Sequence, residues 1–270
     1  MKNYGINWEK EKSEQSEEDW KFGASSQPCI AEIPEYLRQD YLPKGECQNI
    51  GEEKMDCASR YGLNILESKF NWLLREGKIS KENFKWLQDN QYIQNNSIEF
   101  SDAFVAINSG TTRGGNSLKA PLEAIRKQGL VPKHLLPQLQ TFDEHHNPQR
   151  ITKKLKDLGK EFTERFIINY EKVYEPEMGG LLTKDFLGVA GFAWTSPING
   201  EYPKSSNPPN HAFMIFKSPK YYAFDNYIDS VDGDFIKKLS SDYDFVDYGY
   251  RVFISSESVV KLNWFQKLWK

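Results

Sequence analysis

The two halves of this chain carry different hydrophobic patterns, and this change limits the possible folds more than any other feature of the sequence. Apolar residues fall at helical spacing in four stretches of the first half, 56–77, 81–90, 102–108 and 118–128. Runs typical of strands occupy four stretches of the second half, 187–194, 211–216, 221–224 and 250–254. This order predicts an α+β protein, with a mainly helical N-terminal half packed against an antiparallel β-sheet and a cleft between them.

The remaining segments set the expected domain boundaries. Residues 1–19 are rich in charge and are predicted to form a mobile leader. Residues 20–270 then make a single domain, with a helical lobe at about 56–175 and a β lobe at about 186–256. Within the helical lobe, the charged and amphipathic stretch 148–174 predicts a long surface helix that serves as scaffold.

Charge and hydropathy exclude several classes of function. The 270 residues hold 35 Lys and Arg against 38 Asp and Glu, and this balance argues against a nucleic-acid binder, which normally has a basic face. No uncharged apolar run approaches the ~20 residues of a membrane span, and the N-terminus lacks the apolar centre of a signal peptide. We therefore expect no membrane or nucleic-acid partner, and a cytoplasmic location.

The cysteines and histidines are few. Cys29, Cys47 and Cys57 do not make a disulfide framework and lack the close-spaced pairs of a structural zinc site. Whether Cys29 and Cys47 pair is left open by the sequence. His145 and His146 are adjacent, and adjacent side chains rarely face one ion, so a polar loop is the expected structure there. No metal and no organic cofactor is predicted.

Cys57 and His211 stand out by their positions. Cys57 lies at the start of the long helix, where unpaired backbone N–H groups and the helix dipole stabilise a thiolate. The alternative is a small buried thiol that only fills space. His211 opens a strand, and a hairpin centred near residue 219 would bring Asp225 or Asn226 close to it. Such a residue can orient the imidazole of a nucleophile–base pair.

Several short motifs accompany these residues in a fixed order. Cys57 lies 154 residues before His211, near the ~130–150 of papain. A double glycine, Gly114-Gly115, precedes a helix, and the later motifs are Asn210-His211-Ala212 and Ala223-Phe-Asp-Asn-Tyr227. In this order they resemble the papain-like cysteine peptidases over about residues 20–254. The stretches Trp20–Ala24 and Leu42–Gln48 are similar to a divergent branch of that family found in phage and bacterial genomes. This resemblance implies a location in the cytoplasm of the producing or host cell, or on a virion.

The resemblance implies a role for each matching residue. Cys57 would be the nucleophile, His211 the base and later the acid, and Asp225 the orienter, with Asn226 as the alternative. Gln48 matches the glutamine whose amide forms the oxyanion hole with the Cys57 backbone N–H. The residues implied to bind an extended substrate are Gly114, Gly115, Asn210 and Ala212.

The sequence also departs from the family pattern. Gln48 lies nine residues before Cys57, a longer gap than in papain. Asp56 would oppose a thiolate at Cys57 unless it points away or caps the helix. Tyr227 replaces the tryptophan that shields the orienting residue. The chain before Cys57 is too short for the long inhibitory prosegment of lysosomal relatives, so no such latch is expected.

Three functions are consistent with these residues. The first is a cysteine peptidase that hydrolyses peptide or protein substrates through a Cys57 acyl-enzyme. The second is an amidase or transpeptidase that uses the same triad on a cell-wall or other isopeptide bond. The third is a catalytically silent binding or virion module that keeps the fold.

Overall fold

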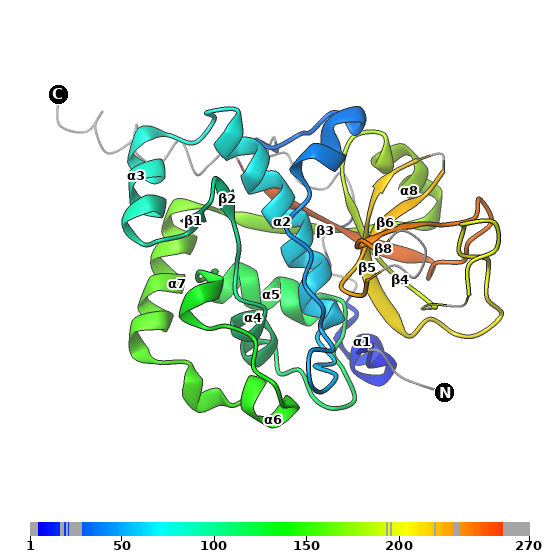
Figure 1. Ribbon diagram of the computed structural model, residues 1–270, viewed down its shortest axis with the longest axis horizontal. Coiled ribbons are helices and arrows are strands. Elements are labelled where there is room, and N and C mark those ends of the chain that lie inside the picture. Colours follow the sequence, from blue (N-terminus) through cyan, green and yellow to red (C-terminus); the bar gives the residue numbers. More distant parts are fainter. Residues whose placement is uncertain are drawn as a thin grey trace.

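Helices and strands separate in space much as they do along the chain. The computed structural model describes residues 5–16, 19, 21, 29–192, 194, 196–218, 220–228 and 233–255. Most helices gather in one half and most of the sheet in the other (Figure 1). The predicted α+β architecture is therefore confirmed. Apart from Lys21, the Trp20–Ala24 motif lies outside the described residues.

The predicted helices of the first half are present as α2 (Cys57–Arg75), α3 (Lys81–Asp89), α4 (Asp102–Asn108) and α5 (Lys119–Gln128). The side chains of Ser80 and Ser101 cap α3 and α4 by accepting hydrogen bonds from backbone N–H groups. α5 ends at Gly129, whose φ is +74°. A Cβ at Gly129 would lie 1.9 Å from the Gly159 oxygen, so only glycine fits this close approach.

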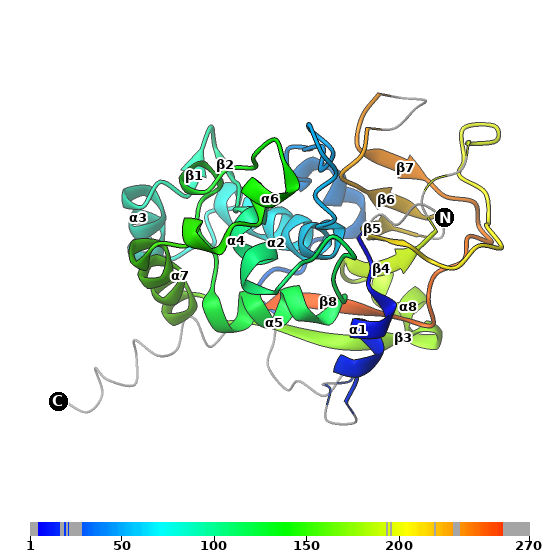
Figure 2. The same ribbon diagram turned by 90° about the horizontal axis from the view of Figure 1, so that it is seen from below.

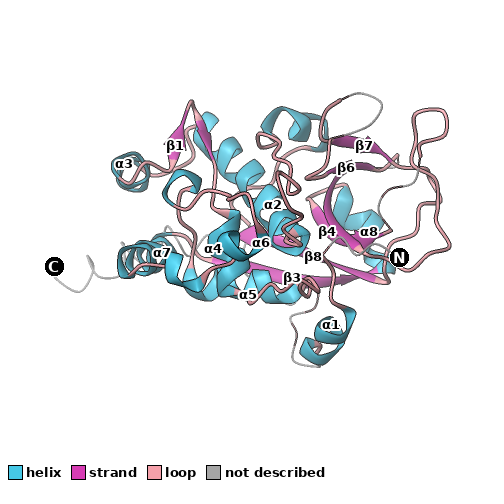
Figure 3. Ribbon diagram, turned by 60° about the horizontal axis from the view of Figure 1, so that its bottom comes forward, coloured by secondary structure: helices cyan, strands magenta, loops and turns pink. Residues whose placement is uncertain are grey.

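One antiparallel sheet of six strands occupies the second half, in the order β3–β8–β4–β5–β6–β7 (Figure 3). Its strands are β3 (Ile168–Tyr174), β4 (Leu187–Gly191), β5 (His211–Lys217), β6 (Tyr222–Phe224), β7 (Ile236–Lys238) and β8 (Tyr248–Ile254). A separate hairpin joins β1 (Ile93–Gln94) to β2 (Ser97–Ile98). The pairs Met214↔Phe224 and Ile215↔Ala223 join β5 to β6 in the predicted register, centred on position 219.

The prediction of one helix over residues 148–174 is wrong. The structure has a 3₁₀ turn η3 (Pro148–Arg150), then α7 (Lys153–Arg165), and then the edge strand β3. β3 pairs with β8 from Ile168↔Ile254 to Tyr174↔Tyr248, and six of its seven residues are buried. A strand buried on both faces lacks the alternation that distinguishes it from a helix, so the apolar spacing continued without a visible break.

Further helical segments surround this framework. They are α1 (Trp8–Glu14), α6 (Phe142–His145), α8 (Glu175–Leu182), η1 (Glu35–Tyr41) and η2 (Lys133–Leu135). α1 lies in the stretch expected to be a mobile leader. Within the described ranges, no helix is both long enough and apolar enough to cross a bilayer.

The core holds the first turns of α2 against the sheet. Tyr61 is fully buried, and a Cβ at Gly188 of β4 would lie 2.2 Å from its ring. Glycine at this position thus lets the helix approach the strand closely. Because close-packed protein interiors have low compressibility, this contact fixes the N-terminal end of α2 relative to β4 and β5.

Candidate active site

Cys57 is the first residue of α2, and its side chain is fully buried. Its position at the helix start is the predicted one, where the dipole and the unpaired N–H groups favour a thiolate. The backbone N–H of Ala212, in β5, donates to Cys57 Sγ at 3.4 Å. The helix start and the first residues of β5 therefore meet at the sulfur.

His211 is the first residue of β5, and Asp225 directly follows β6. The antiparallel register brings them together, with His211 Nε2 2.6 Å from Asp225 Oδ1. Both side chains are fully buried. Cys57, His211 and Asp225 thus form one contiguous group, assembled from a helix start and the ends of two neighbouring strands.

The charges of this group reinforce one another. Burial lowers the pKa of His211, but Asp225 and Cys57 outweigh it and raise the pKa to about 10. Burial raises the pKa of Asp225, but His211 and Lys237 outweigh it and hold this pKa below its usual value. An imidazolium held between two anions can stabilise a thiolate and later supply a proton.

Two residues around Asp225 were not identified from the sequence. The indole N–H of Trp194, in the segment between β4 and β5, donates to Asp225 Oδ2 at 2.7 Å, and its ring centroid lies 5.8 Å from that of His211. Lys237 in β7 places Nζ 3.5 Å from the same oxygen. Trp194 therefore covers the pair, although the motif comparison pointed to Tyr227 for this place.

Asn226 has a different environment from Asp225. Its amide donates to the Glu46 oxygen at 3.3 Å and accepts from Asn64 at 3.1 Å. Its backbone oxygen accepts from the Gln48 N–H at 3.1 Å. These contacts tie the loop that carries Gln48 to α2, while Asp225 supplies the carboxylate that contacts His211.

The amide of Gln48 is held by two neighbours. Its Nε2 donates to Glu53 Oε1 at 2.5 Å and to the Tyr227 hydroxyl at 2.8 Å. The Tyr227 hydroxyl donates to Glu53 Oε2 at 2.5 Å, and its ring centroid lies 5.3 Å from that of His211. The longer gap between Gln48 and Cys57 therefore contains the acidic residue that anchors both Gln48 and Tyr227.

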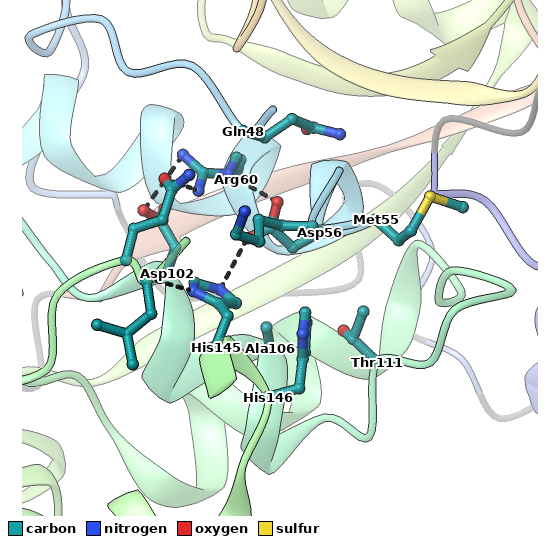
Figure 4. A network of polar contacts seen from close by, with 12 residues as sticks. Gln48, Met55, Asp56, Arg60, Asp102, Ala106, Thr111, His145 and His146 are labelled. Atoms are coloured by element: carbon teal, nitrogen blue, oxygen red, sulfur yellow. Dashed lines mark hydrogen bonds and ion pairs between the residues drawn. The ribbon is translucent and has the colours of Figure 1, made fainter. Parts of the chain in front are cut away.

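Asp56, next to Cys57, directs its carboxylate into a separate buried network (Figure 4). Its oxygens lie 2.8 Å from Arg60 Nε and 3.3 Å from His145 Nε2. Burial would raise the pKa of Asp56, but Arg60 and His145 outweigh it and hold the pKa well below its usual range. The negative charge of Asp56, which was expected to oppose a thiolate at Cys57, is thus neutralised by Arg60. His145, expected in a polar loop, is fully buried.

Replacing Arg60 by methionine should destabilise the protein by about 3–5 kcal/mol, because it leaves buried carboxylates without their cation. Arg60 Nη1 also lies 3.2 Å from Asp102 and 3.4 Å from Glu46, so three acids lose a partner. The free energy of unfolding measured in urea reports this change. Arg113→Met, which removes an exposed cation, is the matched control. Equally small changes in the free energy of unfolding for Arg60→Met and Arg113→Met would contradict the role of Arg60 as the cation that neutralises the buried carboxylates.

Residues 5–16, here called the N-terminal segment, lie over Cys57. On the helical side, Asn7 N donates to the Asn116 oxygen at 2.8 Å, and Asn116 N donates to the Gly5 oxygen at 2.9 Å. On the sheet side, the Trp8 indole donates to the Pro209 oxygen at 2.6 Å. A Cβ at Gly5 would lie 2.9 Å from Cys57 Sγ. The segment therefore bridges the two halves of the domain directly above the nucleophile candidate.

α1 secures this segment. The fully buried Glu11 accepts from the Leu118 N–H at 2.6 Å and from the Tyr248 hydroxyl at 2.7 Å. Asn7 caps the helix by accepting from Lys10 N at 3.0 Å. Figure 2 shows α1 beside α5 and β8. Part of the stretch predicted to be a leader therefore forms a short helix whose buried acidic side chain has specific partners at the start of α5 and on β8.

The residues expected to bind substrate lie around the same place. A Cβ at Gly115 would lie 2.3 Å from the Gly5 backbone, and Gly114 N donates to Thr112 Oγ1 at 3.2 Å. Asn210 is buried, and its N–H donates to the Gly191 oxygen at 3.0 Å. The double-glycine loop is thus occupied by the N-terminal segment.

Cys29 and Cys47 are free thiols, each partly buried. Within the described part of the chain, no three His, Cys, Asp or Glu side chains are grouped so that they could hold a metal ion.

Comparison with solved structures identifies the fold. No protein-family model and no curated protein sequence matches the chain. Xylellain, a cysteine protease from Xylella fastidiosa, aligns over 94% of this chain and 95% of its own, with a TM-score of 0.56 and 12% identity. A procathepsin B from Trypanosoma congolense aligns over 95% and 87%, with a TM-score of 0.57 and 8% identity. The proform of the ragweed pollen cysteine protease Amb a 11 aligns over 94% and 75%, with a TM-score of 0.55 and 11% identity. The chain therefore has a papain-like fold.

Proposed function

We propose that this chain is a papain-like cysteine peptidase with Cys57 as nucleophile, His211 as general base and acid, and Asp225 as orienter. The observation that supports this most strongly is the buried contact between His211 and Asp225 at the start of the helix that carries Cys57. The papain-like fold supports it independently, since the structures to which it is similar are cysteine proteases.

The proposed reaction has two steps. The Cys57 thiolate attacks the substrate carbonyl, and the His211 imidazolium protonates the leaving amine as the C–N bond breaks. A water molecule, deprotonated by His211, then attacks the thioester and releases the acid, with the proton ending on His211. No metal or organic cofactor enters either step.

Gln48 is the proposed side-chain donor to the oxyanion, and it acts with the Cys57 N–H. Both hydrogens of its Nε2 are donated to Glu53 and Tyr227, so one of these two bonds must open when the oxyanion forms. Gln48→Ala should lower kcat about 10²-fold and leave KM nearly unchanged, because the lost bond matters chiefly in the transition state. Steady-state kinetics on a peptide substrate measures both constants. Gln149→Ala, at an exposed glutamine, is the control. A raised KM at unchanged kcat would exclude the oxyanion role.

The alkaline limit of activity should follow His211. Its pKa is raised to about 10, so the imidazolium persists through neutral pH and is lost as the pH rises through that value. The kcat/KM profile should accordingly fall only near pH 10. Asp225→Asn removes the carboxylate that raises this pKa, and should move the alkaline limb down by about 1–2 units. Asp143→Asn, at an exposed carboxylate, should not move it.

The divergent phage and bacterial branch is the proposed place of this chain within the fold family. An aspartate rather than an asparagine at position 225 supports it, together with the near-complete coverage of the bacterial protein xylellain. The cytoplasmic or virion location stays a prediction from the sequence.

A further inference from the structure

Lys237 is a buried cation beside the catalytic group, and the reaction steps proposed above do not use it. We propose that Lys237 is a positioning residue that balances the charge of Asp225 and so sets the pH range in which the thiolate–imidazolium pair of Cys57 and His211 exists. This inference rests on the proposed peptidase function and adds a residue to its machinery.

The fold holds Lys237 in place from several directions. It lies in the middle of β7 and pairs with Ala223 of β6, two residues before Asp225. Its side chain is 1% exposed. Nζ lies 2.5 Å from the Tyr227 backbone oxygen, to which it donates, and 5.4 Å from the centroid of the Trp194 ring. A long, flexible side chain is thereby fixed with its charge next to Asp225.

The two oxygens of Asp225 have different partners. Oδ1 contacts His211 Nε2 at 2.6 Å, whereas Oδ2 accepts from Trp194 and lies 3.5 Å from Lys237 Nζ. Lys237 thus meets the carboxylate on the side away from the imidazole. It can hold the orientation of Asp225 without competing for the oxygen that His211 uses.

The charges require a second cation. With a thiolate at Cys57 and an imidazolium at His211, the carboxylate of Asp225 would leave one net negative charge in a fully buried group. Such an unpaired charge is costly in a low-dielectric interior. Lys237 brings the sum to zero. A neutral asparagine as orienter, as in the papain pattern, would need no such partner.

The other titratable groups near Asp225 do not supply this charge. Tyr243 approaches from the segment before β8. Burial, and to a smaller extent the charge of Asp225, raise the pKa of Tyr243, so its hydroxyl stays neutral. Tyr227 is bonded to Glu53, and burial together with that carboxylate raises its pKa as well. Among the described residues, His211 and Lys237 are the cationic side chains in contact with Asp225.

The primary test is the pH midpoint of thiolate formation at Cys57. It is followed by the ultraviolet absorbance difference between each variant and the same variant carrying Cys57→Ala, in the full chain. Lys237→Met should raise the midpoint by about one pH unit, because the thiolate loses a favourable cation. Lys237→Arg should restore it. The matched control is Lys238→Met, at the exposed next residue of the same strand, and it should leave the midpoint unchanged. Equal midpoints in the Lys237→Met and Lys238→Met proteins would overturn the proposal.

A double substitution keeps the test decisive if Lys237→Met fails to fold. Asp225→Asn combined with Lys237→Met removes both charges and leaves a neutral orienter. This protein should have a higher Tm than either single variant, and its thiolate midpoint should return toward the wild-type value. Additive losses of Tm, or an unfolded double variant, would show that Lys237 does not act by balancing Asp225.

The measurement also separates this inference from the peptidase function. Thiolate formation requires no peptide cleavage, so a chain that forms the thiolate but cleaves no peptide would reject the peptidase proposal alone. The shift in Lys237→Met would still decide the role of Lys237. In a chain that does cleave peptides, the acidic limb of kcat/KM should move with the thiolate midpoint.

Discussion

Replacing Cys57 by alanine should abolish peptide hydrolysis, with kcat falling on the order of 10⁴–10⁶-fold, because the acyl-enzyme route loses its nucleophile. The same substitution should abolish labelling by an epoxide or vinyl-sulfone probe. Hydrolysis of casein and of a peptide library measures the first result, and mass spectrometry of the labelled protein measures the second. His211→Ala should lower both hydrolysis and labelling, since the thiolate loses its counter-ion.

The matched control for this substitution is Cys47→Ala, because Cys47 is partly buried and adjoins Gln48. That protein should keep its hydrolysis rate and its label. Labelling that persists in Cys57→Ala would place the reactive thiol elsewhere. Trp8→Ala removes a hydrogen bond that holds the N-terminal segment over Cys57. If neither the wild-type protein nor this variant is labelled, a catalytically silent binding or virion module becomes the better account of the chain. Cleavage of peptidoglycan fragments but not of casein would favour the amidase or transpeptidase.

The parts of the site that the sequence predicted are those fixed by local structure. Cys57 was identified because it starts a helix, and His211 because it starts a strand. The approach of His211 to Asp225 or Asn226 followed from a single hairpin register, which the structure confirms. That relation depends on spacing between two consecutive strands, so one sequence was enough to derive it. The choice of Asp225 over Asn226, and the pairing of Cys57 with His211, came from the resemblance to the papain-like family.

The parts that the sequence missed depend on contacts between distant segments. Trp194 comes from the segment between β4 and β5, and Lys237 from a strand of three residues. A buried lysine has no sequence signature, since most lysines are exposed. Glu53 lies in the stretch between Gln48 and Cys57, which is longer than in papain. The length of this stretch did not show which residues Glu53 binds. The strand β3 was concealed because it is buried on both faces.

The contacts of the N-terminal segment predict that access to Cys57 is restricted in the full chain, so that its activity is lowered but not lost. The segment's hydrogen bonds to Asn116, Pro209, Leu118 and Tyr248, at ~1 kcal/mol each, give at most about 4 kcal/mol before the cost of ordering the segment is subtracted, and so at most roughly a 10³-fold reduction in accessible sites. Removing residues 1–16 should therefore raise kcat/KM by up to about 10³-fold. Trp8→Ala in the full chain should raise it by about 10-fold, because one indole and its bond to Pro209 are lost.

Gly5 offers a sharper version of this experiment. Its φ is +118°, and a Cβ there would lie 2.7 Å from the Met55 oxygen as well as against Cys57 Sγ. Gly5→Val should force the segment off the nucleophile and activate the full chain. Lys12→Ala, at an exposed position of α1, is the matched control and should change nothing. An unchanged kcat/KM in both the truncated and the Gly5→Val proteins would mean that the segment does not restrict access to Cys57.

The pH dependence of this activation follows from Glu11. Burial raises its pKa above the usual value in the docked segment, whereas a released segment returns it to that value. Docking therefore takes up a proton. It is strongest at low pH, and it weakens as the pH rises through the raised pKa. The gain in kcat/KM from removing residues 1–16 should accordingly be larger at acidic than at neutral pH. Glu11→Gln, which docks an uncharged isostere, should remove this difference. A gain from truncation that is independent of pH in the otherwise unaltered chain would show that Glu11 does not control docking.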